Sequence, residues 1–453
     1  MDDSVLPSKL LSDLSSAVDI VRRHPFIHIY SHFDADGLTA ASIVAKALMR
    51  EGREFSITIF PTLTDPQMEI IENTEAKCVL VTDLGASYIK RFDRMTCDVV
   101  VLDHHTALDH AERICYANPH LYEIDGGKAG CGASMALLFA VTMNEKNWDL
   151  SPLAMAGIVG DMQNKDGLKG LNVYICDEAV KRGFVTPMPG SLVPLGNLST
   201  ELFMSTSPFI EGVSGNSEGT AKFLEEAGIA PNKDYSNLTP EEHMKLSSLI
   251  AIKLINQGTY KESLEKCARP RYYLPAWGTD AASLASVVDS CGRQEEPDVG
   301  IAVCLGDSSA MERAKALNAE TRKEIMTAAL HIAANKDKII ELENVQWYDT
   351  TECGNSGAIC SIIMDFFGNP HKPTIGVNRS NPIAKVSSRG NDELFNRKNV
   401  NLADAMRGSC AAAGGNGGGH REAAGGSFPA EKYEEFLKAV DLIIGEQMKS
   451  AGL

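Results

Sequence analysis

Hydrophobic positions in the first 165 residues fall into short runs separated by helical stretches. Four of these runs are rich in β-branched residues and bounded by turns, which is typical of strands; they are residues 26–30, 55–60, 78–82 and 99–102. Between the first two runs, the segment LTAASIVAKALMREG has the spacing of a helix that ends at Gly52. This alternation predicts a parallel sheet with helices on its faces, and such sheets bind ligands at the carboxyl ends of their strands.

The pattern changes in the middle of the chain. A Pro-rich connector at 187–194 precedes helical segments without clear strands between them, and from about residue 298 the alternation resumes. There we expect strands within 299–306, 339–348 and 373–379, with a long helix between the first two. We therefore expect an α/β protein with three parts. They are a parallel-sheet domain at 1–185, a helical insert or connector at 186–297 and a smaller α/β domain at 298–453.

Charge and composition narrow the class of protein. The chain has 60 acidic and 43 basic residues and a net charge of −17, which argues against a protein that coats nucleic acid by bulk positive charge. A nucleic-acid enzyme remains open, because carboxylates gathered around bound cations add to the same total. The sequence has no run of about 18 apolar residues, no signal-peptide pattern and no CxxC pair among its 11 cysteines. These features predict a cytoplasmic protein with reduced thiols and no membrane span.

Four segments carry acidic or imidazole side chains in the same structural context. SHFDADG, VTDLG and LDHH each follow a predicted strand, and GIVGD ends a helical stretch. Because the carboxyl ends of parallel strands open on one side of a sheet, we expect these side chains to converge. They are His32, Asp34, Asp36, Asp83, Asp103, His104, His105 and Asp161.

So many carboxylates packed together would raise one another's pKa values and cost stability unless cations balance them. Mixed carboxylate and imidazole ligands suit Mn²⁺, with Mg²⁺ or Co²⁺ as further candidates. Two such ions about 3.5–4 Å apart can share a hydroxide and clamp a phosphoryl group. A single DxD is more often a solvated loop, and an Asp at a strand end is often only a helix N-cap. The occurrence of four such segments favours the two-metal interpretation.

A glycine-rich segment near the C-terminus, GGNGGGHREAAGGSF, has His420 and Arg421 at its centre. Glycines allow backbone N–H groups to approach an anion, and a helix starting at the following Ala or beyond would add a positive dipole end. The alternative is a flexible linker. Residues 372–421 hold eight basic and three acidic residues, which favours an anion-binding segment.

The four acidic motifs resemble those of the DHH phosphoesterase superfamily, named for the sequence seen here as Asp103-His104-His105. KVSSRG, which ends at Arg389, together with GGGHREAAGG is similar to the signature of the associated DHHA1 domain. Length and the helical middle portion are most similar to archaeal RecJ-like exonucleases, including the GINS-associated nuclease type.

The resemblance implies roles for individual residues. Two manganese ions would be held by His32, Asp34, Asp36, Asp83, His104 and Asp161, with Asp83 as the bridging ligand. Asp103 would orient an imidazole, and His105 would contact phosphate or donate a proton. Contacts to the nucleic acid would come from Arg389, Gly418, Gly419 and His420.

We therefore expect a manganese-dependent phosphodiesterase that releases nucleotides from the ends of single-stranded DNA or RNA. One alternative is a phosphodiesterase acting on nanoRNA or cyclic dinucleotides. The other is a replication-complex scaffold that binds GINS-like partners, a role that can also accompany catalysis. Cleavage polarity, the preference between DNA and RNA, and oligomeric state stay open at this point.

Overall fold

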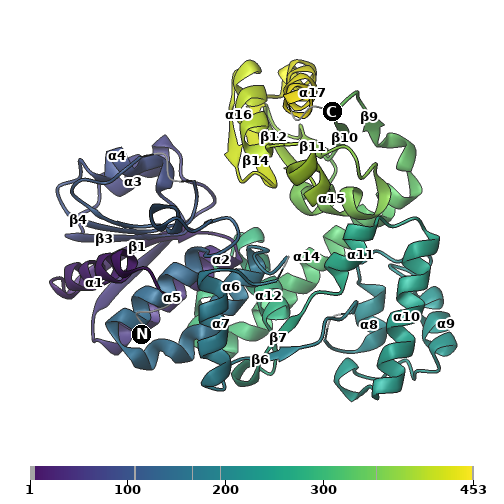
Figure 1. Ribbon diagram of the computed structural model, residues 1–453, viewed down its shortest axis with the longest axis horizontal. Helices are drawn as coiled ribbons and strands as arrows, with labels where there is room; N and C mark the ends of the chain where they lie inside the picture. Colours follow the sequence, from purple (N-terminus) through teal and green to yellow (C-terminus); the bar gives the residue numbers. More distant parts are fainter. Residues whose placement is uncertain (1–5, 107–108, 166, 194, 354, 451–453) are drawn as a thin grey trace. The chain divides into compact units, whose positions relative to one another are not determined.

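The computed structural model describes residues 6–106, 109–165, 167–193, 195–353 and 355–450 (Figure 1). By its internal contacts the chain divides into two compact units. The first unit is Met1–Pro189 with Arg269–Thr321, and the second is Gly190–Ala268 with Arg322–Leu453. The two units are defined by contacts within the chain and do not test where the predicted domains begin and end. The three-part division at 1–185, 186–297 and 298–453 therefore stays a prediction.

The first unit contains the predicted parallel sheet, with strand order β2-β1-β3-β4-β5. All four of its strand pairs are parallel. The strands are β1 (Phe26–His32), β2 (Glu54–Phe60), β3 (Cys78–Thr82), β4 (Asp98–Leu102) and β5 (Cys115–Ala117). The four predicted strands are confirmed; β5 was not predicted, because three residues are too short for a hydrophobic pattern.

Helices cover both faces of this sheet, as Figure 1 shows for the purple and blue part of the chain. On one face lie α1 (Ser8–Arg22), α2 (Ala35–Arg50), α5 (Gly132–Met143), α6 (Ser151–Gly160), α7 (Leu171–Lys181) and α12 (Ala281–Arg293). On the other lie α3 (Asp65–Glu72) and α4 (Ile89–Phe92). Side chains of β3 alternate between the two cores, Leu80 in the first and Val79 and Val81 in the second. Two buried faces explain why the strands are continuous apolar runs.

The rest of the first unit is short elements. They are η1 (Ala86–Tyr88), η2 (Pro119–Tyr122), η3 (Glu145–Leu150), β6 (Thr186–Met188), β7 (Arg271–Leu274), η5 (Pro275–Trp277), β8 (Thr279–Asp280) and α13 (Pro297–Leu305). The strand predicted at 299–306 is wrong, because these residues form α13. Pro297 begins the helix and Gly306, with φ of 96°, ends it. A short, continuous apolar run does not distinguish a helix from a strand by its periodicity.

The second unit begins with a mainly helical stretch, which lies within the region predicted to be helical. That predicted region also contains the short strands β6, β7 and β8 of the first unit, which were not predicted. The elements of the helical stretch are α8 (Leu198–Phe203), α9 (Ser217–Ala227), η4 (Tyr235–Asn237), α10 (Pro240–Asn256) and α11 (Lys261–Cys267). The start of α10 is fixed by a capping box, in which Thr239 and Glu242 each accept from the other's backbone N–H. The long predicted helix is α14 (Ser308–Ala334), which carries the chain from the first unit into the second.

The C-terminal part of the second unit is built on a mixed sheet with strand order β13-β14-β12-β11-β10-β9. Among the described residues of this sheet, β10 and β11 form the only parallel pair. The strands are β9 (Ile340–Glu341), β10 (Gln346–Asp349), β11 (Thr374–Asn378), β12 (Ile383–Arg389), β13 (Asn416–Gly419) and β14 (Ala423–Pro429). Around them lie η6 (Lys336–Lys338), α15 (Ser356–Ile362), η7 (Ile363–Phe367), η8 (Glu393–Arg397), α16 (Leu402–Ala412), η9 (Ala430–Lys432) and α17 (Tyr433–Ser450). The α/β class predicted for this region is confirmed.

The glycine-rich segment differs from its prediction. It forms the hairpin of β13 and β14, and strand β14, not a helix, begins at Ala423. Its glycines allow α16 to pack closely: a Cβ on Gly417 would lie 2.4 Å from the carbonyl oxygen of Met406, and one on Gly426 would lie 2.5 Å from Cys410 Sγ. Close packing therefore accounts for part of the glycine content, in addition to any role in binding.

Candidate metal centre

The predicted acidic residues of the first unit lie at the carboxyl ends of β1, β3 and β4 and at the end of α6. Strand β1 pairs with β2 on one side and with β3 on the other, so the sheet order reverses here. This is the position at which open parallel sheets bind ligands. The structure brings together His32, Asp34, Asp36, Asp83, Asp103, His104, His105 and Asp161.

The two carboxylates of the DADG segment are held in different ways. Asp34 is the N-cap of α2, and its Oδ1 accepts from the backbone N–H of Gly37 at 3.0 Å. Asp36 is buried, and its two oxygens accept from the backbone N–H groups of Gly132 and Ala133 at 2.7 and 2.8 Å. Because these donors are the first amides of α5, the helix end favours a negative charge on Asp36.

Asp83 lies at the centre of the cluster and is 1% exposed. Its φ of 55° places a non-glycine residue in the left-handed region, a strained conformation that is concentrated at functional sites. Its Oδ1 lies 3.1 Å from His104 Nε2, and its Oδ2 lies 3.5 Å from His32 Nδ1. These distances are those of ion pairs. Within the described residues, neither oxygen has a hydrogen bond of acceptable geometry.

His104 is buried and oriented by the loop that follows β5. Its Nδ1 donates to the carbonyl oxygen of Gly126 at 2.7 Å, which directs Nε2 toward Asp83 and toward Asp36 Oδ2, 3.7 Å away. A histidine whose Nδ1 donates to a carbonyl offers Nε2 as a metal ligand.

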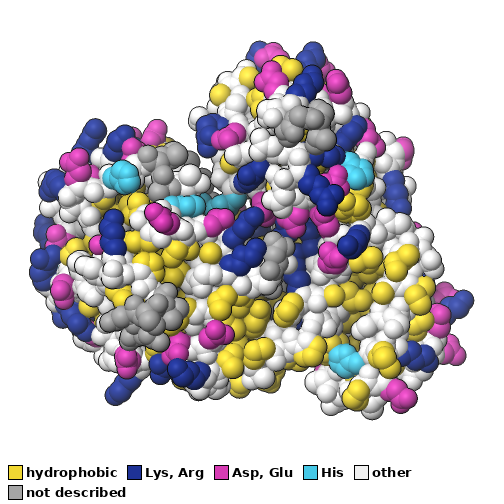
Figure 2. Space-filling view, in the orientation of Figure 1, with side chains coloured by type: hydrophobic (Ala, Val, Ile, Leu, Met, Phe, Trp, Pro, Cys, Tyr) yellow, Lys and Arg dark blue, Asp and Glu magenta, His cyan; other side chains and the backbone are white. Residues whose placement is uncertain are grey.

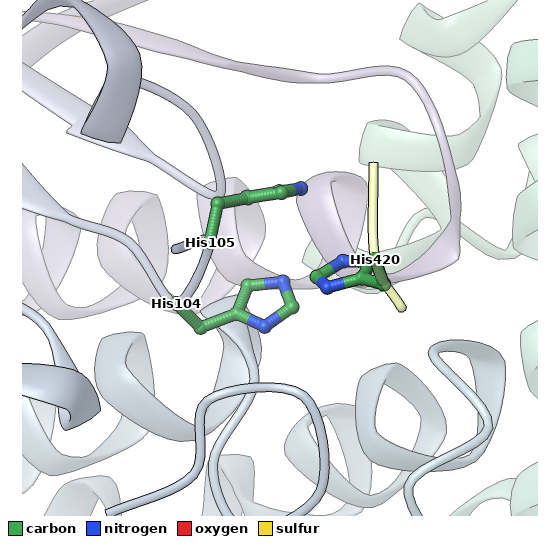
Figure 3. A group of neighbouring side chains, drawn as sticks. All are labelled: His104, His105 and His420. Carbon is green, nitrogen blue, oxygen red and sulfur yellow. The ribbon is translucent and has the colours of Figure 1, made fainter. Parts of the chain in front are cut away.

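Asp103 and His105 form a separate pair beside the cluster. The buried carboxylate of Asp103 accepts from the N–H groups of Ala86 and His104 at 2.7 Å and from Nδ1 of His105 at 2.8 Å. Figure 3 shows the rings of His104 and His105 leaving the same turn, and their planes are tilted by 50°. The side chain of His105 is 36% exposed, whereas that of His104 is buried.

Asp161 follows the last residue of α6. Its Oδ2 accepts from Nε2 of Gln163 at 2.8 Å and lies 3.8 Å from His104 Nδ1. Helix α6 can pack this close to Thr39 and Asp36 because Gly157, on the same helix, has no side chain. A Cβ at that position would lie 2.6 Å from Thr39 Oγ1 and 2.8 Å from Asp36 Oδ1.

Burial and mutual repulsion shift the carboxyl pKa values in this cluster. Burial raises the pKa of Asp36 well above its usual range, and the charges of Asp83 and Asp161 raise it further. Burial also raises the pKa of Asp161 to about 6, with repulsion from Asp83 adding to it against the attraction of His104. Burial acts in the same direction on Asp34, but His32 and the N–H of Gly37 hold that pKa below its usual range. The cluster therefore needs positive charge to be fully ionised.

The donor set fits divalent cations. Two groups of ligand atoms within 4.8 Å of one another share Asp83: His32, Asp34 and Asp83 in one, and Asp36, Asp83 and His104 in the other. The buried Asp83 oxygens, without hydrogen bonds among the described residues, are what a bridging ligand would leave in the protein alone. Asp83, Asp103 and His105 form a further group, but Asp103 already accepts several hydrogen bonds.

The residues predicted to contact nucleic acid lie together at one end of the second sheet. Arg389, the last residue of β12, pairs with Ala423 of β14, and the N–H of His420 donates to the carbonyl oxygen of Ala423 at 2.9 Å. Gly419 closes the hairpin with φ of 130°, and a Cβ on Gly418 would meet nothing within 4 Å. Arg421 instead donates to the carbonyl oxygens of Phe395 and Val400, which gives it a structural role.

Basic residues of the segment 372–421 are partly neutralised by their neighbours. Lys372 pairs with Glu341, Arg379 with Asp349, and Arg407 with Asp404. On the face seen in Figure 2, Lys and Arg side chains are interspersed with Asp and Glu side chains. The charge of this segment is therefore weaker as a binding signal than its composition predicted.

Three residues near the candidate metal centre were not predicted from the sequence. Gln163 binds Asp161, and Asn118 donates to the carbonyl oxygen of His105 at 3.0 Å. Arg293, at the end of α12, pairs with Asp289, and its charge helps to lower the pKa of Asp34. Gln163 lies two residues beyond the GIVGD motif, but nothing in the sequence distinguishes it from a polar residue of an exposed turn.

Known proteins support the assignment of the fold and the family. Residues 26–159 match the model of the DHH family N-terminal domain, and residues 346–446 match that of the DHHA1 domain. The uncharacterized protein MJ0831 of Methanocaldococcus jannaschii is 32% identical over 440 residues, which are 95% of this chain and 96% of that protein.

Solved structures show the same architecture at lower identity. RecJ of Thermus thermophilus in complex with Mn²⁺ has a TM-score of 0.59 at 16% identity, over 98% of this chain and 55% of its own. An exonuclease RecJ bound to manganese has a TM-score of 0.58 at 16% identity, over 97% and 96% of the two chains. CDC45 of Entamoeba histolytica has a TM-score of 0.64 at 12% identity, over 96% and 99%. At these identities the likeness shows a RecJ-like fold.

In the part of the chain that the structure describes, no helix is long and apolar enough to span a membrane. The chain belongs to the DHH family and carries a C-terminal DHHA1 domain.

Proposed function

We propose that this chain is a metal-dependent phosphodiesterase that releases nucleotides from the ends of single-stranded DNA or RNA. The observation that carries the proposal is the pair of ligand groups that share the buried, strained Asp83. The RecJ-like fold supports it, since the solved RecJ structures of that fold are complexes with Mn²⁺ or Mg²⁺.

In this proposal two divalent ions, Mn²⁺ first and Mg²⁺ or Co²⁺ as alternatives, would be held by His32, Asp34, Asp36, Asp83, His104 and Asp161. When bound, such ions lower the pKa of water and neutralise charge on the phosphoryl oxygens. The protein's contribution is to fix the ligands beforehand. The amides of α5 hold Asp36, and the carbonyl of Gly126 holds His104.

Asp103 and His105 have the proposed task of handling a proton. Hydrolysis joins a water oxygen to phosphorus and breaks a phosphorus–oxygen ester bond, and the departing oxygen takes up a proton. Because Nδ1 of His105 lies against Asp103, Nε2 points away from that carboxylate. Asp103 thus orients a partly exposed imidazole that would contact phosphate or protonate the leaving oxygen.

Substrate contacts are proposed for Arg389, Gly418, Gly419 and His420 of the second unit. A guanidinium binds phosphate through paired hydrogen bonds, and a glycine hairpin lets a nucleic-acid backbone approach the protein backbone closely. The open space beside Gly418 fits such an approach.

Two alternatives to an exonuclease make different predictions. A phosphodiesterase for nanoRNA or cyclic dinucleotides would use the same ions but would not shorten a polymer. A scaffold for GINS-like partners would need no ions, and the fold likeness to CDC45 is compatible with such a partner role. The intact ligand groups favour catalysis over a purely scaffolding role.

The test is digestion of end-labelled single-stranded DNA, single-stranded RNA and a dinucleotide, run side by side with Mn²⁺ and with EDTA. We expect Mn²⁺-dependent release of mononucleotides from one labelled end of a single strand, absent in Asp83→Asn protein. Cleavage of the dinucleotide alone would replace the exonuclease by the short-substrate enzyme. No cleavage of any substrate by the wild-type protein would contradict a phosphodiesterase.

A further inference from the structure

Gln163 is a buried side chain whose hydrogen-bonding capacity is fully used. It is 4% exposed. Its Nε2 donates to Asp161 Oδ2 and to the carbonyl oxygen of Gly126, both at 2.8 Å. Its Oε1 accepts from the N–H of Gly130 at 2.9 Å and from Nδ2 of Asn172 at 2.7 Å. An amide offers two donor hydrogens and two acceptor lone pairs, and here all four are engaged.

One of these four bonds reaches a proposed metal ligand directly, and a second reaches another ligand through a shared carbonyl oxygen. Asp161 is held through one carboxylate oxygen, Oδ2. The carbonyl oxygen of Gly126, the other acceptor, also accepts from Nδ1 of His104 at 2.7 Å. One amide group therefore fixes the rotation of Asp161 and the position of the carbonyl that sets the tautomer of His104.

A third bond leads toward Asp36 through the backbone. Oε1 of Gln163 accepts from the N–H of Gly130. Gly130 lies two residues before Gly132, and the N–H of Gly132 donates to Oδ2 of Asp36 at 2.7 Å. On its far side the amide is braced by Asn172, which accepts from Oγ of Ser134 on α5 at 2.6 Å. The network is rigid because each buried polar group in it has a partner.

We propose that Gln163 is a positioning residue of the metal centre, which holds Asp161, the His104 tautomer and the loop before α5 in the arrangement that binds ions. The inference rests on the proposed function, since it concerns the same ions. The ordinary alternative is a structural glutamine that contributes only to folding stability. The two differ in metal affinity, because groups that orient metal ligands change affinity about 10- to 100-fold when removed.

The experiment compares Gln163→Met with a matched control, Gln346→Met. Gln346 is a buried glutamine of the second unit that bonds to Asn369, Lys372 and Thr374, none of which is a proposed metal ligand. For each protein, Mn²⁺ binding to the ion-free chain is titrated by calorimetry and by the Mn²⁺ EPR signal, and the melting temperature is measured in EDTA.

We expect Gln163→Met to weaken the binding of at least one ion about 10- to 100-fold, while Gln346→Met lowers the melting temperature and leaves Mn²⁺ affinity unchanged. Equal, wild-type affinity in both variants would overturn the positioning role. Gln163→Asn, which retains an amide but withdraws it by one methylene, against Gln346→Asn repeats the comparison if the Met variant does not fold. A wild-type chain that binds no Mn²⁺ would overturn the proposed function and this inference together, whereas unchanged affinity in the Gln163 variants overturns this inference alone.

Discussion

Nε2 of His104 lies 3.1 Å from Oδ1 of Asp83, and the two residues follow neighbouring strands of the parallel sheet, β4 and β3. This contact joins the third acidic motif to the second. Because Asp83 also faces His32 of the first motif, it is the residue common to both proposed ligand groups. In the proposed centre Asp83 should therefore matter to both ions, whereas His32, Asp34, Asp36 and His104 each belong to one group.

Asp83→Asn should abolish most of the activity, by about 1,000-fold or more, since an ion supplies several kcal/mol of transition-state stabilisation. The same variant should be at least as stable as the wild type in EDTA, because it lacks a buried charge that repels Asp36. In the wild type this repulsion raises the pKa of Asp36. The measurements are initial rates with Mn²⁺ and melting temperatures with EDTA. Asp177→Asn, at an exposed position on α7, is the matched control. Near-wild-type activity in Asp83→Asn protein would contradict the proposed metal centre.

The arrangement of the acidic motifs could be predicted because it depends on local pattern. Each strand that precedes a motif is an apolar run, and parallel topology carries the strand ends to one edge of the sheet. The sequence therefore located Asp34, Asp83 and His104 at a common edge, where the structure places them. Their roles as ligands stay predictions.

The support of the site could not be predicted, because it depends on contacts between distant residues. Gln163 reaches Gly130 and Gly126, which lie 33 and 37 positions earlier in the chain. The hairpin of β13 and β14 depends likewise on close packing against α16, and the apolar run 299–306 lies almost entirely in helix α13, which begins at Pro297. Such packing leaves no periodic signal in a single sequence.

Binding of Mn²⁺ should release protons, so that the apparent affinity rises with pH. Burial and repulsion raise the pKa of Asp36 and that of Asp161, the latter to about 6. Burial lowers the pKa of His104, but the surrounding carboxylates outweigh it and raise that pKa well above its ordinary value. An ion requires these groups deprotonated, so it must displace their protons. Calorimetric titrations in two buffers of different ionisation enthalpy count the protons, and we expect more at about pH 5.5 than at about pH 8. An affinity independent of pH would contradict this ligand set.

The same pKa values predict how the stability of the ion-free protein varies with pH. Asp161 has a folded-state pKa of about 6, above the value of roughly 3.9 expected in the unfolded chain. The folded state therefore binds the proton more tightly, and its stability falls as the pH rises from about 4 through 6. We expect the melting temperature in EDTA to decline over this window, and less so in Asp161→Asn protein. Identical declines in the two proteins would assign the effect to other groups.

Asp103→Asn should reduce turnover by about 100-fold or more while leaving Mn²⁺ affinity near the wild-type value. The carboxylate accepts from Ala86, His104 and His105, and an amide cannot accept at both of its ends. His105 would lose the partner that fixes Nδ1 as a donor, and general acid catalysis of this kind is worth about 100- to 10,000-fold. The pH profile of kcat distinguishes the loss of an oriented His105 from a structural defect. Only the loss of an oriented His105 should move the alkaline limb of that profile to lower pH. A parallel loss of Mn²⁺ binding would instead place Asp103 among the metal ligands.

Arg389→Ala should raise the KM for single-stranded substrate about 10-fold and leave both Mn²⁺ affinity and the rate on a dinucleotide largely unchanged. The reason is that Arg389 lies beside the β13–β14 hairpin, where a phosphate would meet the guanidinium, and a hydrogen bond to a charged group contributes about 1.5–3 kcal/mol. The slope of log affinity against log salt should fall by about one, as for the loss of one phosphate contact. Arg407→Ala is the matched control, because Arg407 is an exposed arginine of the same unit that pairs with Asp404 at 2.6 Å. Equal effects of the two substitutions on KM and on the salt slope would mean that Arg389 acts through general charge and is not a specific contact to the strand.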